Sequence, residues 1–237
     1  MSTNNTRVKA MPAHRKISLT AGILYLLTFV SIPTLTLYST AKSSGYITGT
    51  SSDTAALMGI LSEIIVALAG IGTAVVLFAV LKKQNETLAI GLIASRVLEA
   101  ASIFVGTAVI LTLVSLKQAN VGSDALVVGQ TLVSLYDRIF LVSQSFLPGI
   151  NDLLLGILLY KSRLVPKAIA LIGIVGGPMI IASLTAVILG VIALDSPIKG
   201  VSAIGVALFE LTLGIWLVAK GFNPKAVAAL DKKPTAS

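Results

Sequence analysis

Six long blocks of mostly apolar residues fill almost the whole chain, and they constrain its fold more than any other feature. Each block has about 19 to 29 residues, and about 20 helical residues cross the ~30 Å hydrocarbon core of a bilayer. A helix hydrogen-bonds its own backbone, which lipid requires of any segment that crosses it alone. The sequence therefore predicts an all-α, polytopic transmembrane helix bundle of about six helices. The blocks are Ile17–Tyr38, Ala55–Leu81, Leu88–Leu116, Ile139–Tyr160, Val165–Ala193 and Val201–Ala219.

The composition supports a membrane domain rather than a soluble one. Only 12% of the residues are charged, whereas a soluble domain carries about 25%. We expect a transmembrane domain over residues 17–220, with polar tails at 1–16 and 221–237. The predicted location is the cell membrane, which the chain crosses several times, and the predicted partner is the lipid bilayer.

The basic residues between the blocks predict the orientation. Thirteen of them fall in or beside the two tails and the connections after the second and fourth blocks, whereas the other connections hold three lysines, Lys42, Lys117 and Lys199, with Arg138 at the start of the fourth block. Because basic loops stay in the cytoplasm, both ends of the chain are predicted to be cytoplasmic. A net charge of +8 on a soluble protein would suggest a nucleic acid partner, but here the basic residues set topology and no nucleic acid is expected.

Several kinds of chemistry find no support in the sequence. The chain has no cysteine, and its one histidine, His14, lies in the N-terminal tail. This argues against thiolate metal sites, paired-histidine haem and disulfides. No lysine lies within a span, and no nucleophile–base pair or phosphate-binding loop is evident. We predict no catalytic residues, no metal and no cofactor, and we do not expect an enzyme.

The segments between blocks also carry expectations. The connection Ser39–Thr54 is rich in Ser, Thr and Gly and is predicted to be an exposed connector. The amphipathic stretch Ala125–Arg138 is expected along the outer surface. Pro148 lacks an N–H group, so we expect a bend near residues 144–149, with Gln144 or Asn151 compensating a freed backbone group.

Ionisable residues inside the blocks are the candidate functional groups, because burying them in lipid is costly without a partner or a cavity. Counting helical rise from the inner boundary predicts an inner cluster of one base and three acids. Its members are Arg96, Glu99, Asp152 and Glu210. An outer cluster of one base and two acids is predicted from Glu63, Asp137 and Arg138.

Two interpretations of the inner cluster stay open at this point. Arg96 can bridge Glu99 and either Asp152 or Glu210 and so hold helices together, as in a non-catalytic membrane scaffold or sensor. Three carboxylates around one guanidinium can instead bind a proton or a cation, as in a small transporter or permease-like protein.

Several segments resemble a bacterial and archaeal family of integral membrane proteins known as domain of unknown function 4386. The resemblance runs from about Lys16 to Phe222, and its most specific parts are Arg96-Val-Leu-Glu99 and Tyr160–Pro166. It implies an integral membrane fold without implying an activity, and it marks Arg96, Glu99 and Glu210 as pattern positions. The segments that carry it are Ala21–Phe29, Gly72–Phe78, Ser95–Ala100, Leu159–Pro166, Phe209–Leu211 and Trp216–Phe222.

Overall fold

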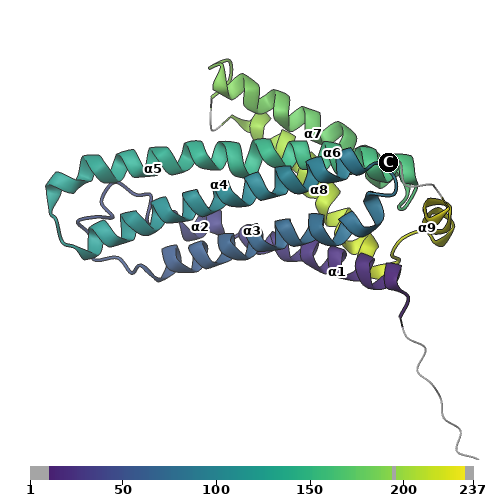
Figure 1. The fold of residues 1–237 in the computed structure, drawn as a ribbon. Helices are drawn as coiled ribbons and strands as arrows, with labels where there is room; N and C mark the ends of the chain where they lie inside the picture. Colours follow the sequence, from purple (N-terminus) through teal and green to yellow (C-terminus); the bar gives the residue numbers. More distant parts are fainter. Residues whose placement is uncertain (1–10, 194–195, 233–237) are drawn as a thin grey trace, which may run out of the picture.

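The long helices of the computed structural model run side by side along the length of the bundle (Figure 1), and the predicted all-α helix bundle is confirmed. The structure describes residues 11–193 and 196–232, and this portion contains no β-strand. Its elements are α1 (Ala13–Thr28), η1 (Phe29–Ser31), α2 (Thr34–Leu37), α3 (Thr54–Leu81), α4 (Glu86–Gln118), η2 (Ser123–Ala125), α5 (Leu126–Leu141), η3 (Val142–Phe146), α6 (Leu147–Ser162), α7 (Lys167–Ile188), α8 (Pro197–Ala219) and α9 (Pro224–Asp231).

Within the described residues, five helical segments are long and apolar enough to cross a membrane. They are Thr54–Leu81, Glu86–Gln118, Ser123–Ser162, Lys167–Ile188 and Gly200–Ala219. Each contains most of one predicted block. Together they support a multi-pass membrane protein.

The first block differs from its prediction, because its helix does not run unbroken to Tyr38. Helix α1 has 16 residues and ends at Thr28, and the chain then passes through η1 and α2. Pro33 cannot donate a backbone hydrogen bond, so carbonyl groups of the preceding turn lose their partners. The Phe29 carbonyl, which an N–H at position 33 would serve in a regular helix, accepts from the Ile32 N–H at 3.1 Å. Two hydroxyls add hydrogen bonds near the break: Ser31 Oγ donates to the Thr28 carbonyl at 3.0 Å, and Thr34 Oγ1 donates to the Ser31 carbonyl at 2.6 Å.

The fourth block is the end of a continuous helical run over residues 123–162, formed by η2, α5, η3 and α6. Its first part packs along α4 and continues the bundle (Figure 1), which corrects the expectation that it lies on the outer surface. Just before Pro148, η3 has π-helical geometry, in which the Leu147 N–H donates to the Val142 carbonyl. The π-helical segment is therefore the local response to the proline, within the region where a bend was expected.

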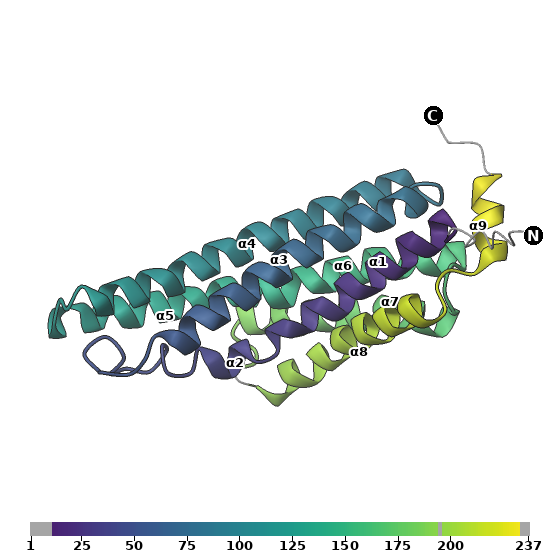
Figure 2. The same ribbon diagram turned by 90° about the horizontal axis from the view of Figure 1, so that it is seen from below.

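Helices α3, α4 and α5 extend beyond the ends of α7 and α8 at one end of the molecule (Figures 1 and 2), which we call the loop end. The connection between α2 and α3 folds over this extension. Tyr46 is 2% exposed, and Ala41 and Ile47 are also buried against α4 and α5. The connection is thus partly packed, because three apolar side chains in an otherwise polar segment enter the core. The expectation of an exposed connector was wrong for these residues.

A carboxylate at the start of α3 fastens this connection. Asp53 accepts hydrogen bonds from Lys117 Nζ at 2.7 Å, Tyr46 Oη at 2.8 Å and Gln118 Nε2 at 3.0 Å. These hydrogen bonds lower the pKa of Asp53 from 3.8 to about 2, and the bond from Lys117 has the largest effect.

The lowered pKa predicts an acid-sensitive loop end. Because Asp53 is more acidic in the folded protein than in the unfolded chain, its stabilising effect is present above pH ~4 and is lost as the pH falls toward 2. Asp53→Asn should remove the effect at neutral pH, with a loss of less than about 1 kcal/mol because the pair is near the surface. The exchange rates of the backbone amide hydrogens of residues 41–53 measure this loss of stability. The exposed Asp124, changed to Asn, is the control, and equal exchange in both variants would contradict the prediction.

The opposite end carries most of the basic residues, and we call it the basic end. The start of α1, the α3–α4 and α6–α7 connections and α9 all lie there (Figure 1). Helices extend into both predicted polar tails, since α1 begins at Ala13 and α9 packs through Ala226 and Leu230. Which side of the membrane this end faces stays a prediction.

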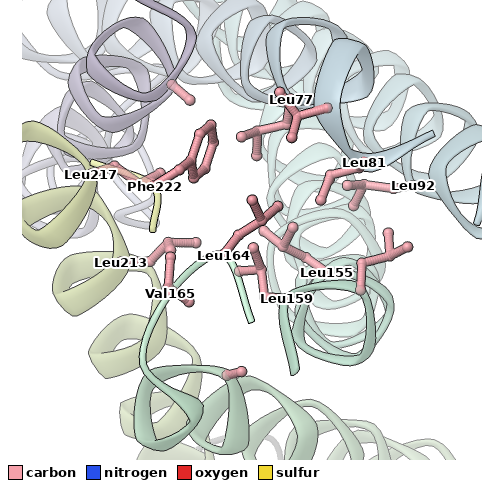
Figure 3. Packing of buried hydrophobic residues seen from close by; sticks show 14 of the residues in the cluster. Leu77, Leu81, Leu92, Leu155, Leu159, Leu164, Val165, Leu213, Leu217 and Phe222 are labelled. Atoms are coloured by element: carbon pink, nitrogen blue, oxygen red, sulfur yellow. The ribbon is translucent and has the colours of Figure 1, made fainter. Parts of the chain in front are cut away.

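A large apolar core fills the basic end. Figure 3 shows Phe222 and Leu164 pointing into the same core as Leu77 and Leu155, and all four are buried. Helix α1 closes the bundle against α8, where a Cβ atom on Gly22 would lie 2.9 Å from the Gly214 carbonyl oxygen. Arg15 adds donors to the end of α8, from Nη1 to the Leu217 carbonyl at 2.8 Å and from Nη2 to the Val218 carbonyl at 2.5 Å.

Candidate functional site

Four of the predicted site residues meet between α4, α6 and α8. Arg96 and Glu99 are one turn apart on α4, Asp152 comes from α6, and Glu210 comes from α8. Their side chains face the bundle interior: Arg96 is 3% exposed, Glu99 7% and Asp152 0%. We call this group the inner cluster.

The guanidinium of Arg96 connects two of the three acids. Nη1 donates to Glu99 Oε2 at 2.9 Å, and Nη2 donates to Glu210 Oε1 at 2.6 Å. The second pair joins α4 to α8. A planar guanidinium offers separate nitrogens in a fixed arrangement, so one arginine can serve two carboxylates at once.

Asp152 lies beside this bridge but takes no part in it. Among the residues that the structure describes, neither of its carboxylate oxygens has a hydrogen-bond partner. The charged groups that act on it are Glu210, Arg96 and Glu99. Arg96 Nε is also without a partner there. The inner cluster therefore combines a buried ion-pair network with a buried carboxyl group that stands outside it.

Two further side chains complete the inner cluster. Asn151, which precedes Asp152, donates from Nδ2 to Glu99 Oε2 at 2.7 Å. The ring of Tyr25 on α1 lies 5.7 Å from the Arg96 guanidinium carbon and is 1% exposed. Asn151 was expected to serve the helix backbone near Pro148, but its amide binds Glu99 instead. Tyr25 did not stand out in the sequence, because a lone tyrosine in an apolar helix carries no spacing signal.

A cavity of about 220 Å³ opens beside the inner cluster. Arg96, Glu99 and Glu210 form its polar wall, and Asp152 does not line it. Much of the remaining lining is apolar, and it includes Phe29 and Ile32 at the break after α1. The interruption of the first block thus lies against the cavity that reaches the buried charges.

The predicted outer cluster does not assemble as expected. Glu63 is 1% exposed and accepts hydrogen bonds from Tyr136 Oη at 2.6 Å and Gln144 Nε2 at 2.8 Å. A third donor is the Tyr38 hydroxyl, at 3.2 Å. Asp137 instead forms an ion pair with Lys42, and Arg138 is exposed on α5.

The side chains that donate hydrogen bonds to Glu63 have roles in the structure that the sequence did not indicate. Tyr38 and Tyr136 are 2% and 4% exposed, and their rings pack edge to face with centroids 5.4 Å apart. Gln144 was expected to compensate a backbone group, but its amide donates to Glu63. Gln144 also lines the cavity, so the π-helical segment connects the Glu63 network with the inner cluster.

The comparison with protein families gives a match over most of the chain. The family model described as domain of unknown function DUF4386 matches residues 20–221. The chain belongs to this family. The matched range contains every residue of the inner cluster, of which the resemblance marked Arg96, Glu99 and Glu210 as pattern positions. Comparisons with curated proteins and with solved structures give no match.

Membership of the DUF4386 family carries no assigned activity. Any chemical role of this member must therefore be argued from the cavity and the buried charges beside it. The most unusual group among these is Asp152, because it is the acid that the Arg96 network leaves without a donor.

Proposed function

We propose that this DUF4386 protein is a small, permease-like transporter in which Asp152 holds a proton or a small cation. The observation that carries the proposal is the state of Asp152, a fully buried carboxyl group without a hydrogen-bond partner among the described residues. Burying an ionised carboxylate without a partner is costly, so a bound proton or cation would relieve that cost.

The charge balance of the inner cluster supports this proposal. Arg96 already donates one nitrogen to Glu99 and another to Glu210. If all three acids were ionised, the cluster would carry an excess negative charge in a region shielded from water. Intramembrane groups with such an imbalance commonly mark ion pathways and proton relays.

The cavity supplies the route that a transporter needs. Glu210 lines the cavity and belongs, with Asp152, to the inner cluster. In our proposal, a proton enters through the cavity, reaches Glu210 and passes to Asp152. A proton on Glu210 would weaken its ion pair with Arg96, and the Arg96–Glu99 pair would be affected because it shares the same guanidinium.

The proposal predicts a pH-dependent stability that depends on Asp152. If the folded protein holds a proton that the unfolded chain releases, stability falls as the pH rises, by up to about 1.4 kcal/mol per pH unit for one proton. Asp152→Asn should remove this slope between pH ~5 and ~8, because the amide has the same shape and does not titrate. Thermal unfolding of purified protein measures the slope, and proteoliposomes containing a pH-sensitive dye measure proton flux.

The control is Asp137→Asn, which makes the same chemical change in the Lys42 ion pair outside the cluster and should leave the slope intact. A melting temperature raised by sodium or potassium in the wild type, but not in Asp152→Asn, would identify a cation as the occupant. A wild-type curve that is flat with pH and unaffected by these cations would refute the proposal. The charges would then serve only to hold helices together, as in a membrane scaffold or sensor.

A further inference from the structure

A second pocket, far from the inner cluster, lies at the basic end. It has a volume of about 460 Å³ and lies between the α6–α7 connection and the segment that joins α8 to α9. Three basic side chains from separate parts of the chain contribute to its lining: Arg163, Lys167 and Lys220. All three residues are exposed.

The walls of this pocket are fixed by the core behind them. Leu164 and Val165 follow Arg163 and are 0% and 4% exposed, and Phe222 is 4% exposed (Figure 3). The Asn223 N–H donates to the Leu164 carbonyl at 2.9 Å, which joins the two connecting segments. A pocket with anchored walls loses little conformational entropy when it binds a ligand.

The positive charge of the pocket is not neutralised within the protein. In the described part of the chain, Arg163, Lys167 and Lys220 form no ion pair with a carboxylate, whereas Lys83 at the same end pairs with Asp231 at 2.6 Å. Helix α7 begins at Lys167 without a side chain capping its first turn, so the partial positive charge of that helix end adds to the field. An anionic group is the complementary ligand.

The surroundings of the pocket identify the source of that anion as lipid. Trp216 lines the pocket near the end of α8, and its indole N–H donates to the Gly221 carbonyl at 3.1 Å. Tryptophan is enriched at the ends of transmembrane helices, where they meet the lipid headgroups. Apolar side chains next to the pocket are open to lipid: Leu171 on α7 is 45% exposed and Ile215 on α8 is 51% exposed. The acyl chains of a bound lipid would pack on these apolar side chains, whereas a free phosphate ion would make no favourable contact with them.

We propose that this pocket binds the phosphate-bearing headgroup of an anionic phospholipid, held by Arg163, Lys167 and Lys220. Basic pockets between transmembrane helices bind such headgroups through charge and hydrogen bonds. Arg163 offers a guanidinium fork that matches two phosphate oxygens, and the lysines add point charges. The site would tie the α6–α7 connection and the end of α8 to the membrane surface.

The test uses the full chain in lipid nanodiscs of phosphatidylcholine with or without phosphatidylglycerol. We expect native mass spectrometry to find retained phosphatidylglycerol on the wild type, together with a raised melting temperature. The triple variant Arg163→Gln/Lys167→Gln/Lys220→Gln should bind this lipid about 100-fold more weakly. The matched variant Lys16→Gln/Lys82→Gln/Lys161→Gln changes the same charge at the same end outside the pocket and should retain the lipid.

Three outcomes would overturn the proposal. The first is equal retention of phosphatidylglycerol by the two triple variants, and the second is equal retention of phosphatidylcholine by the wild type. The third is stabilisation of the detergent-solubilised protein by inorganic phosphate to the extent given by phosphatidylglycerol, which would assign the pocket to a soluble anion. None of these outcomes affects the predicted dependence of protein stability on pH through Asp152. This inference and the proposed function can therefore fail separately.

Discussion

Arg96→Ala should destabilise the bundle by about 3–5 kcal/mol, the cost typical of removing one partner from a buried ion pair. Arg96 is the donor for Glu99 and Glu210 together, so its loss leaves both carboxylates short of a partner. Thermal or denaturant unfolding of purified protein measures the effect. Arg96→Lys should recover only part of the loss, because an ammonium lacks the separate, fixed nitrogens that serve two acids.

Two further variants make the Arg96 result interpretable. Arg138→Ala removes an exposed arginine from α5 and should change stability by less than about 0.5 kcal/mol. The triple variant Arg96→Met/Glu99→Gln/Glu210→Gln should be more stable than Arg96→Ala, since it leaves no uncompensated charge in this network. A loss below 1 kcal/mol for Arg96→Ala would show that the ion pairs contribute little.

Gly177→Ala should separate α6 from α7 and cost about 1–3 kcal/mol, as overpacking of a close interface does. A Cβ atom at Gly177 would lie 2.4 Å from the Gly149 carbonyl oxygen and 3.1 Å from the Leu153 backbone nitrogen. Both are backbone atoms and cannot rotate away, so a helix must move. The unfolding free energy of the purified variant measures the cost.

Gly91→Ala is the matched control for the α6–α7 prediction. Gly91 also lies inside a helix, but its added Cβ atom would meet only the Leu154 side chain at 3.8 Å, an ordinary contact. This variant should be neutral or more stable, by up to about 1 kcal/mol, because alanine favours helix more than glycine does. Equal effects at the two positions would contradict the close packing of α6 and α7.

The helices could be predicted from the sequence because length and hydropathy decide whether a segment can cross a bilayer. The pairing of Arg96 with Glu99 could be predicted as well, since residues three apart share one face of a helix. Glu210 was expected near them from its depth in its own helix, and the structure places it on the other side of the same guanidinium.

Depth alone failed for the outer cluster, because two residues at one level can lie on opposite faces of their helices. Glu63 and Arg138 were grouped by depth, yet Glu63 faces the bundle interior and Arg138 faces outward. The partners that Glu63 has in the structure are two tyrosines and an amide. Such neutral donors carry no charge signal, so sequence reasoning that followed charges did not find them.

The effects of the two prolines on their helices were only partly predictable from the sequence. Pro148 correctly marked the region where the fourth block departs from a regular α-helix, but the departure takes the form of a π-helical segment. Pro33 lies near the end of the first block and was not given weight, although it helps end that helix early. How a chain accommodates a missing N–H depends on the local backbone: before Pro33 the Phe29 carbonyl accepts from the Ile32 N–H in a 3₁₀ turn instead.

The contact between α1 and α8 has a consequence for biosynthesis. Helix α1 is synthesised before α8, but the carbonyl groups that Arg15 binds belong to Leu217 and Val218, 202 and 203 residues further along the chain. The close packing of α1 against α8 at Gly22 likewise cannot form until Gly214 has been synthesised. During membrane insertion, α1 therefore packs mainly against α3 until α8 arrives. The bundle is completed only when α8 has been synthesised, so a ribosome that stalls before α8 would leave α1 without this partner.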